Sequence, residues 1–387
     1  MSIVFINDHP FFVDKNNNVF TSGTLDSSIW SRFTDNFGDL TVIGRGISLD
    51  DNNHKHKSSS CQQVSFDLFM QIKGGIDYYK YRREIREKLT LYIQNSKYIV
   101  IRLPSSIGVM AAEICVTLGK KYFVEVVGCA FDSLWYYGGA LSKLLAPINA
   151  NKNKKAIKSA NAVVYVTKEY LQRKYPNQND QINASNVIIE DFPISVLQNH
   201  INFLKRSTTK KIFGMIGNVE IPYKGYEYLF KALSTIPDPF ELHIVGGGKQ
   251  DWINTLIVKY KLLGKVILRG RINNKDDMYN FLDGLDIYFQ PSLTEGLPRG
   301  VIEAMSRGCP VIATNVGGIP ELIQSNKTYN SKDYMKLGNL ISDNINNINE
   351  LISMSVINFN KSKEYSFEKI NARRNTFFNK IKDKIKN

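Results

Sequence analysis

The 387-residue sequence has little cysteine and no long uninterrupted apolar run. Its four cysteines, Cys61, Cys115, Cys129 and Cys309, lie far apart and form no Cys-x-x-Cys pair. This spacing argues against zinc and disulfide frameworks and fits reduced thiols in the cytoplasm. The N-terminus has no basic segment followed by an apolar core, so we expect no signal peptide. No stretch approaches the roughly 20 apolar residues that span a bilayer, so any membrane contact is expected to be peripheral.

Acidic residues are also scarce relative to basic ones. The chain carries 50 Lys and Arg against 36 Asp and Glu, a net charge of +14. Such a field attracts anions, which include nucleic acid, an acidic membrane face and phosphorylated small molecules. With 43% hydrophobic residues the composition is that of a globular protein. The length predicts two domains, because one hydrophobic core rarely serves so long a chain.

The second half alternates short apolar runs with helical patterns. Strands are predicted at 211–219, 240–248, 266–272, 286–292 and 310–314, with amphipathic segments between them. This alternation predicts right-handed βαβ units on a parallel sheet. Ligands of such sheets bind outside the carboxyl ends of the strands.

The first half shows a similar but less regular alternation, which predicts a second α/β domain. Its expected strands are 2–7, 40–46, 98–104, 122–128 and 162–167, with helices at 25–37 and 107–121. We therefore expect an N-terminal domain at 1–195 and a C-terminal domain at 196–362, with a polar linker at about 195–210. Residues 363–387 are predicted to form a helix that packs back on the N-terminal domain. Its apolar face contains Ile370, Phe377, Phe378, Ile381 and Ile385.

The segment "PSLTEGLPRGVIEAM", Pro291–Met305, is the most informative part of the chain. After the strand at 286–292 the chain must turn sharply, and a helix is expected to start near Arg299. Pro298 suits the first helical position, where a missing N–H costs nothing. Gly296 lets a ligand approach the backbone closely. The free N–H groups of residues 297–300, starting with Leu297, then form an anion site suited to a diphosphate.

Two carboxylates, Glu295 and Glu303, lie on either side of this predicted anion site. A carboxylate near a diphosphate would be repelled unless it accepted hydrogen bonds from hydroxyl groups. Glu303 is a candidate to bind the hydroxyls of a ribose, and Glu295 those of a sugar beyond the phosphates. The alternative is that both side chains are solvated and only favour the helix dipole.

Glu295 and Glu303 have seven residues between them, and "GCPVIATNVGGIPELI" follows. This pattern resembles the E-x7-E signature of retaining glycosyltransferases of family four, including those that make bacterial O-antigen and capsular polysaccharide. The resemblance is most specific over residues 211–325. It implies an α/β protein of the GT-B fold, in which two Rossmann-like parallel-sheet domains face a central cleft and a nucleotide-activated sugar is the donor.

The resemblance also assigns donor-binding residues. The family's phosphate-binding lysine precedes a glycine, and "YKG" places it at Lys224. Its usual Gly-Arg pair is Gly217–Asn218 here, so the arginine cation is replaced by a neutral amide. Arg299 is a candidate replacement, the alternative being a solvated residue at the helix start. The remaining matches are the glycine turns that contact the donor and the segment that cradles the base: Gly23, Gly246, Gly247, Arg271 and Ile272. The alternatives are an ordinary helix start at Gly23 and a simple helix-entry loop at Gly246 and Gly247.

The segment "EVVGCAFDSLWYYGG" at 125–139 is expected to face the acceptor. It resembles a segment of bacterial polysaccharide-synthesis transferases and would deliver Asp132 and Trp135. Asp132 could orient the acceptor hydroxyl, and Trp135 could stack on a sugar ring. The alternatives are a helix N-cap for Asp132 and a core aromatic for Trp135. His9, which follows the first strand, is interpreted as structural.

A basic stretch lies between residues 138 and 175. It contains one acidic residue, Glu169, and an apolar segment at 141–148 precedes most of its basic residues, which are Lys143, Lys152, Lys154, Lys155, Lys158, Lys168, Arg173 and Lys174. Apolar and basic side chains together suit an anionic membrane surface and a polyprenyl-diphosphate-linked acceptor. The alternative is a solvated lysine-rich loop beside a core helix.

The sequence therefore predicts a cytoplasmic enzyme, peripheral at the inner face of the cell membrane. It would transfer a sugar, with retention, from a nucleotide-sugar, expected to be a UDP-sugar, to a saccharide or a polyprenyl-diphosphate-linked saccharide acceptor in bacterial surface-polysaccharide synthesis. Lys224, Glu295 and Asp132 are the expected catalytic residues, and no metal, cofactor or nucleic-acid partner is expected. The alternatives are a sugar-nucleotide epimerase or a phosphorylase of the same fold, and a basic nucleic-acid-binding protein.

Overall fold

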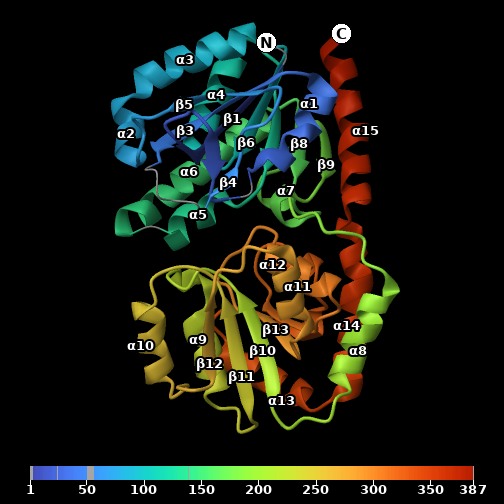
Figure 1. Ribbon diagram of the computed structural model, residues 1–387. Helices are drawn as coiled ribbons and strands as arrows, with labels where there is room; N and C mark the ends of the chain where they lie inside the picture. Colours follow the sequence, from blue (N-terminus) through green and yellow to red (C-terminus); the bar gives the residue numbers. More distant parts are fainter. Residues whose placement is uncertain (1–2, 24, 50–55, 138, 387) are drawn as a thin grey trace. The chain divides into compact units, whose positions relative to one another are not determined.

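A computed structural model describes the chain except for residues 1–2, 24, 50–55, 138 and 387. The chain forms two compact units (Figure 1). Unit 1 contains Met1–Ala184 and Asn371–Asn387, and unit 2 contains Ser185–Ile370. The division therefore falls between Ala184 and Ser185, whereas the sequence placed the domain boundary near residue 195. None of the helices in the described part of the chain combines the length and apolar character needed to cross a membrane.

Unit 1 is built on a sheet whose main strands run parallel in the order β5-β3-β1-β6-β7-β8-β9. These strands are β1 (Ile3–Val13), β3 (Leu40–Ser48), β5 (Val64–Phe69), β6 (Tyr98–Leu103), β7 (Phe123–Val126), β8 (Ala162–Tyr165) and β9 (Asp180–Asn183). Two short strands, β2 (Val19–Thr21) and β4 (Lys57–Ser58), add an antiparallel extension beside the end of β1.

The helices of unit 1 follow the predicted alternation. They are α1 (Ser31–Phe37), α2 (Gly75–Lys80), α3 (Arg82–Asn95), α4 (Ser106–Thr117), α5 (Ala130–Tyr137), α6 (Ala140–Lys158) and α7 (Tyr170–Lys174), with a 3-10 turn η1 at Ser27–Ile29. All five strands that the sequence predicted here are present. β5 and β9 were not predicted, because "VSFDLF" and "DQIN" lack the continuous apolar run of a strand buried on both faces.

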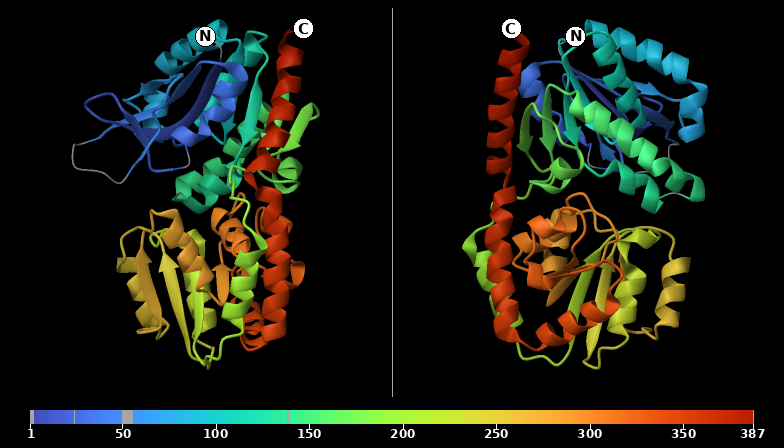
Figure 2. Two further views of the ribbon diagram at one scale, coloured as in Figure 1. Left: turned by 45° about the vertical axis from the view of Figure 1, so that its right-hand side comes forward. Right: turned by 180° about the vertical axis from the view of Figure 1, so that it is seen from behind.

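The last helix, α15 (Phe367–Lys386), places its C-terminal part in unit 1. The Phe378 ring lies 5.2 Å from that of Phe37 and 5.8 Å from that of Phe123. Figure 2 shows this part of the helix beside β9, and Lys380 Nζ donates to Asp180 of that strand at 2.7 Å. Of the predicted apolar face, Ile370, Phe377, Phe378 and Ile381 are buried, whereas the side chain of Ile385 lies outside the described residues.

Beneath α15, strands β6 and β7 carry charged residues inside their apolar runs. Arg102 and Glu125 are almost fully buried, and Arg32 Nη2 of α1 donates to Glu125 Oε2 at 2.9 Å. Arg374 of α15 is buried as well, and its guanidinium donates to the Ala184 carbonyl at 3.2 Å. Burial lowers the pKa of Arg102 to about 10, against the opposing effect of Glu125. This buried charge cluster was not foreseen from the sequence.

Unit 2 contains a fully parallel sheet with the strand order β12-β11-β10-β13-β14-β15. Its strands are β10 (Lys211–Ile216), β11 (Phe240–Val245), β12 (Val266–Gly270), β13 (Ile287–Gln290), β14 (Val311–Thr314) and β15 (Thr328–Tyr329). Counted within the unit, this is the order 3-2-1-4-5-6 of a doubly wound nucleotide-binding fold. The order reverses between β10 and β13, and that switch point is where such folds bind ligands.

Helices cover both faces of the unit 2 sheet (Figure 1). They are α8 (Ile194–Leu204), α9 (Tyr226–Leu233), α10 (Asp251–Lys259), α11 (Lys275–Asp283), α12 (Arg299–Ser306), α13 (Tyr334–Ile345) and α14 (Ile348–Ser362), with 3-10 turns η2 (Pro222–Lys224), η3 (Ile319–Glu321), η4 (Ser325–Lys327) and η5 (Lys363–Tyr365). One core cluster includes residues of α9, α10, α13 and α14, and the other includes residues of α11, α12 and the segment 319–323.

The predicted linker at 195–210 is wrong, because most of it is helix α8. Leu197, His200 and Leu204 are buried, and they recur at the spacing of one helical face. The preceding segment also belongs to unit 2, since Val187 and Ile189 are part of its core. The polar residues between these positions suggested a linker, but they only form the exposed face of the helix.

Candidate active site

The candidate site lies at the carboxyl ends of β10, β11, β12 and β13, around the switch point of unit 2. Glycines let these strand ends approach closely. A Cβ on Gly246 would lie 1.7 Å from the Gly217 carbonyl oxygen, and a Cβ on Gly247 would lie 2.2 Å from Arg271 Nε. Gly246 N donates to the Gly270 carbonyl at 2.8 Å. The structure thus brings together Gly217, Gly246, Gly247 and Arg271, and the half-buried Ile272 follows Arg271 in the chain.

Asn218, which stands where the family has an arginine, shapes the turn after β10. Its Oδ1 accepts a hydrogen bond from Glu220 N at 2.9 Å. The same oxygen would lie 2.4 Å from a Cβ on Gly248, a residue with φ +120°. A glycine is therefore needed opposite Asn218. Asn218 supplies no charge, so the cations of the site come from other residues.

Lys224 reaches the site from the 3-10 turn η2. Gly225, which follows it, has φ +80°, and a Cβ there would lie 1.9 Å from the Pro291 carbonyl oxygen. Leu293 N donates to the Tyr223 carbonyl at 2.7 Å. These two approaches join the Lys-Gly turn to the loop after β13, which explains why glycine follows the lysine.

Lys224 and Glu295 form an ion pair, with Lys224 Nζ 2.7 Å from Glu295 Oε1. The side chains are only 18% and 12% exposed, respectively. Gln290 Nε2 and Ser292 Oγ also donate to Glu295 Oε1, at 2.8 and 2.7 Å. Two residues expected to be catalytic, 71 positions apart in the chain, are thus part of one hydrogen-bonded group.

The loop that carries Glu295 is also held from its other side. A Cβ on Gly317, which has φ +60°, would lie 2.0 Å from the Glu295 carbonyl oxygen, and Gly318 N donates to the Gly296 carbonyl at 2.8 Å. Thr314 Oγ1 donates to the Ser292 carbonyl at 2.7 Å. Backbone contacts on both sides therefore define the position of the loop.

Helix α12 begins at Arg299, as expected, but Pro298 is its N-cap rather than its first helical residue. Pro298 has no N–H, so the first free amides belong to the residues that follow it, and these first-turn groups have no partner within the helix. Arg299 Nη1 lies 3.7 Å from Oε1 of Glu303, one turn further along the helix. Arg299 is about half exposed, and it is therefore available to an anion at this end of the helix.

Three residues of this site were missed from the sequence: Gln290, Ser292 and Gly317. The signal for the first two was present, because they are polar residues directly at the end of a buried strand, "IYFQPS". The role of Gly317 could not be read from the sequence, since it depends on contact with a loop about 20 residues earlier.

The candidate residues of unit 1 lie at two places. Gly23 follows β2, and a Cβ there would lie 2.9 Å from His9 Cε1. His9 Nε2 contacts Thr21 Oγ1 at 2.7 Å, and burial lowers the pKa of His9 to about 4, which keeps the ring neutral. The helix expected after Gly23 is divided into the 3-10 turn η1 and the short helix α1.

Asp132 and Trp135 both lie on α5, after β7. Asp132 is the third residue of this helix rather than its N-cap. Tyr170 OH donates to Asp132 Oδ2 at 3.0 Å, and Lys174 Nζ lies 3.5 Å from Oδ1. Trp135 is 41% exposed and stacks on Phe131 with the ring centroids 5.3 Å apart. Trp135 is therefore not a core aromatic.

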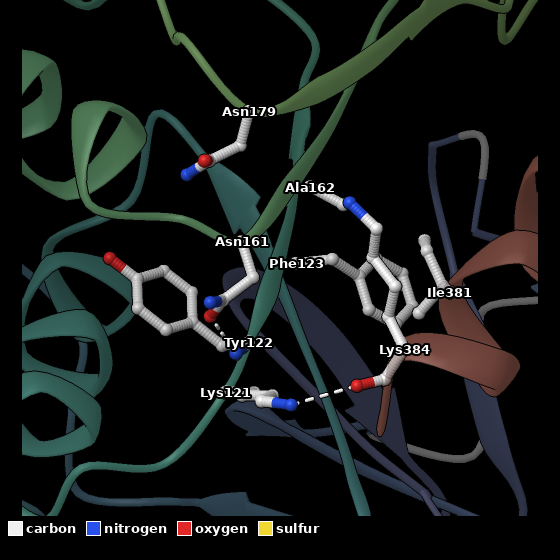
Figure 3. A pocket seen from close by; sticks show the side chains of 8 residues that line it. All are labelled: Lys121, Tyr122, Phe123, Asn161, Ala162, Asn179, Ile381 and Lys384. Carbon is white, nitrogen blue, oxygen red and sulfur yellow. Dashed lines mark hydrogen bonds between the residues drawn. The ribbon is translucent and has the colours of Figure 1, made fainter. Parts of the chain in front are cut away.

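A cavity of about 240 Å³ lies elsewhere in unit 1, between the starts of β7 and β8 and helix α15 (Figure 3). Lys121 Nζ donates there to the Lys384 carbonyl at 2.7 Å, and Asn161 Oδ1 accepts a hydrogen bond from Tyr122 N at 3.0 Å. This is the amino edge of the parallel strands, opposite to the edge where such sheets bind ligands. The residues that line the cavity include none of the candidate site residues.

Comparison with known proteins shows the family of this chain. The family described as "Glycosyl transferases group 1" matches residues 198–354. Protein CapJ of Staphylococcus aureus is 32% identical over 350 residues, which cover 89% of this chain and 86% of CapJ. The O-antigen biosynthesis glycosyltransferase WbnH of Escherichia coli is 29% identical over 154 residues, 39% of this chain and 43% of WbnH.

Solved structures show the same fold at low sequence identity. Sucrose-phosphate synthase from Thermosynechococcus elongatus superposes with a TM-score of 0.72 at 14% identity, covering 98% of each chain. HepE from Anabaena, in complex with UDP-glucose, has a TM-score of 0.67 at 14% identity, covering 98% of this chain and 99% of HepE.

These similarities define a glycosyltransferase of the GT-B fold, as the sequence predicted. The chain belongs to the group 1 glycosyltransferases.

Proposed function

We propose that this chain transfers a sugar from a UDP-sugar to a saccharide acceptor with retention of anomeric configuration. The convergence of Lys224, Glu295 and the amino end of α12 at the switch point of unit 2 carries this proposal. In this proposal unit 2 binds the donor and unit 1 binds the acceptor. The comparison with HepE, solved in complex with UDP-glucose, supports UDP as the nucleotide.

The donor would lie across the strand ends of unit 2. Its diphosphate would accept hydrogen bonds from the first amides of α12 and from the two Lys224 N–H groups that Glu295 does not use. Arg299 would add charge at the same place. The ribose hydroxyls would donate to Glu303 and the sugar hydroxyls to Glu295. The base would lie against the glycine turn at Gly246 and Gly247 and against the segment of Arg271 and Ile272.

The same groups would promote the reaction. As the sugar–phosphate bond lengthens, positive charge develops on the sugar and negative charge on the departing diphosphate. Lys224, Arg299 and the α12 amides would stabilise that negative charge, and such fixed groups usually contribute most to this kind of catalysis. The departing phosphate oxygen would accept the proton of the attacking hydroxyl on the same face of the sugar, which explains retention without a protein nucleophile.

A saccharide acceptor is supported by the residues at the end of β7. The exposed Trp135 offers a ring for stacking on a sugar, and Asp132 is held by Tyr170 and Lys174. Lys174, which is 40% exposed, would also attract the diphosphate of a lipid-linked acceptor. WbnH and the putative colanic acid biosynthesis glycosyltransferase WcaL, both of Escherichia coli, suggest surface-polysaccharide synthesis as the pathway.

Helix α6 supports contact with an anionic membrane. Leu141, Leu144, Leu145 and Ile148 recur at helical spacing and are between 39% and 73% exposed. Lys152 and Lys155, four and seven residues after Ile148, continue the same face and are exposed. No Asp or Glu occurs from 133 to 168. The apolar half of this face would enter the membrane interface, and the lysines would contact lipid phosphates. The attraction of each basic residue to an anionic membrane is worth roughly 1 kcal/mol.

Nucleotide binding can be tested by thermal unfolding with a panel of nucleotides and sugar nucleotides. A ligand of unit 2 should raise the melting temperature, because binding to the folded state alone stabilises it, by about 2.7 kcal/mol at 100 times the dissociation constant. We expect UDP and a UDP-sugar to do so and Lys224→Ala to reduce the effect. A panel without any shift would contradict the donor site. The anomeric configuration of the product, determined by NMR, tests retention.

Membrane contact can be tested by sedimentation with phosphatidylglycerol vesicles at low salt. Replacing Leu144 and Ile148 together with serine should abolish sedimentation, and phosphatidylcholine vesicles should not bind. The matched control replaces Val258 and Leu263 of unit 2, which are 60% and 72% exposed. The membrane proposal would be overturned if both double variants lost sedimentation equally, or if the wild type did not sediment with the vesicles.

A further inference from the structure

The carboxylate of Glu295 is held asymmetrically. Three donors converge on its Oε1 atom: Lys224 Nζ at 2.7 Å, Gln290 Nε2 at 2.8 Å and Ser292 Oγ at 2.7 Å. Within the described residues, the structure records no hydrogen bond to Oε2. One oxygen is therefore occupied by the protein, while the other is left for a ligand.

Gln290 is itself fixed by contacts that leave its amide little freedom. It is 2% exposed, and its Nε2 donates to Ser292 Oγ at 2.8 Å as well as to Glu295. On the other side, Tyr288 OH donates to Gln290 Oε1 at 3.0 Å and accepts a hydrogen bond from Ile216 N at 3.4 Å. Burial raises the pKa of Tyr288 well above its usual value, so the hydroxyl keeps the proton that it donates.

This chain of contacts runs from the backbone of β10, through β13, to the carboxylate. Ile216 is the last residue of β10, and Tyr288 and Gln290 point to the same side of β13 because they are two residues apart. Gly300 of α12 lies against the chain as well, since a Cβ there would be 2.3 Å from Tyr288 OH. The strands at the switch point thereby set the orientation of the Glu295 side chain.

We infer that Gln290 is a positioning residue for Glu295. By holding Oε1 together with Ser292, it turns Oε2 towards a hydroxyl of the transferred sugar and leaves two N–H groups of Lys224 for the diphosphate. This role rests on the proposed donor site. It explains a neutral amide at position 290, because a carboxylate there would repel Glu295 and an apolar side chain would leave Oε1 without one of its donors.

Gln290→Glu gives the sharpest test, read as a pH profile. When protonated, the new carboxyl group can donate to Glu295 as the amide does. When ionised, it places a second negative charge at hydrogen-bond distance, and two such carboxylates share one proton with a raised apparent pKa. We expect kcat/KM of this variant, relative to wild type, to fall by about tenfold or more from about pH 6 to about pH 8.5. A ratio that stays constant with pH would overturn the inference.

Gln290→Met tests the same role without a new charge. It keeps the side-chain volume but removes both N–H donors, so we expect kcat with a UDP-sugar to fall by about tenfold or more. The thermal shift caused by UDP, which lacks the sugar, should be unchanged. The matched control is Asn358→Leu, which removes another buried amide of unit 2, one that donates to the Cys309 carbonyl at 2.9 Å. If both variants lose activity only in proportion to their stability, Gln290 has no positioning role.

Glu295→Gln separates this inference from the proposed donor site. If that variant keeps wild-type activity, the donor site itself is wrong. If it is inactive while Gln290→Met is fully active and Gln290→Glu shows a constant pH ratio, the donor site stands and only the inference about Gln290 fails.

Discussion

Lys224 Nζ lies 2.7 Å from Glu295 Oε1, and both side chains are largely buried. Because the two charges offset each other, burying the pair costs less free energy than burying either charge alone. It also places the proposed phosphate-binding cation and the proposed hydroxyl-binding anion next to each other. A ligand that presents a phosphate and a neighbouring sugar hydroxyl can therefore engage both without breaking the pair.

Removing either partner should abolish most of the activity. We expect Lys224→Ala and Glu295→Ala each to lower kcat/KM by on the order of 100-fold, the effect of losing one charge-stabilising group. The double variant should lose little more than either single variant, because residues that act as a unit are not additive. Steady-state kinetics with a UDP-sugar would measure this.

Lys259 and Glu227 provide the control for these single and double variants. They form an ion pair of the same length, 2.7 Å, in the same unit, but they are 55% and 43% exposed and lie outside the site. Their alanine variants should keep wild-type activity. Equal kinetic losses from the two pairs would show that the Lys224–Glu295 pair has only a structural effect.

Gly317→Ala should impair both stability and activity. The residue has φ +60°, and a Cβ would lie 2.0 Å from the carbonyl oxygen of Glu295, so the loop must move. Gly264→Ala is the control, because Gly264 has a similar φ of +76° with open space around its Cβ position. Both variants bear a backbone strain of about 1 kcal/mol. Only Gly317→Ala should lower kcat, and equal kinetics for the two variants would contradict the proposed loop contact.

His200 should make the protein sensitive to acid. Burial first, then Arg307 and Arg206, lowers its pKa to about 3, against about 6.5 in the unfolded chain. The ring is thus neutral in the folded state, and the stability that this contributes is present above about pH 6.5 and is lost as the pH falls towards 3. At about pH 5 the loss amounts to about 2 kcal/mol.

The test compares wild type with His200→Leu in urea unfolding at about pH 7.5 and about pH 5. Between these two pH values the wild type should lose about 2 kcal/mol more than the variant. Each protein serves as its own reference at the higher pH, so a constant offset caused by packing cancels. Parallel pH dependences would show that His200 is not the titrating group.

Asp286→Asn should destabilise unit 2. Arg206 forms a bidentate pair with the buried Asp286, at 3.0 and 2.7 Å, and Ile212 N donates to the same carboxylate at 2.7 Å. The substitution leaves the Arg206 guanidinium without its charged partner, and breaking such a pair costs about 3 kcal/mol. The exposed pair Arg83–Glu87 is the control, since Glu87→Gln should change the free energy of unfolding by less than about 0.5 kcal/mol. Chemical denaturation would contradict the prediction if both variants matched wild type.

Much of the fold was predictable from the sequence, because most of the parallel strands are apolar runs bounded by turn residues. "DIYFQPS" and "RGVIEAM" predicted a strand, a sharp turn and a helix from Arg299, and the structure has all three. The errors occurred in segments that mix polar and apolar residues. The polar face of α8 was interpreted as a linker, and β9, with the sequence "DQIN", was not predicted.

The sequence predicted some residues of the candidate site but not how the site is assembled. The positions of Glu295, Glu303 and Lys224 followed from spacing and resemblance. Their partners did not, because the hydrogen bonds of Gln290 and Ser292 to Glu295, and the approach of Gly317 to its backbone, depend on side-chain direction and loop position.

The residue pattern alone predicted two α/β domains, the helix that starts after Pro298, and the carboxylates Glu295 before that helix and Glu303 within it, since these features depend on neighbouring residues. Only the tertiary structure decided that Lys224 and Gln290 donate hydrogen bonds to the same oxygen of Glu295. The physical reason is the reversal of strand order between β10 and β13. It places the ends of two strands that are far apart in the chain side by side, where one buried carboxylate can accept donors from both.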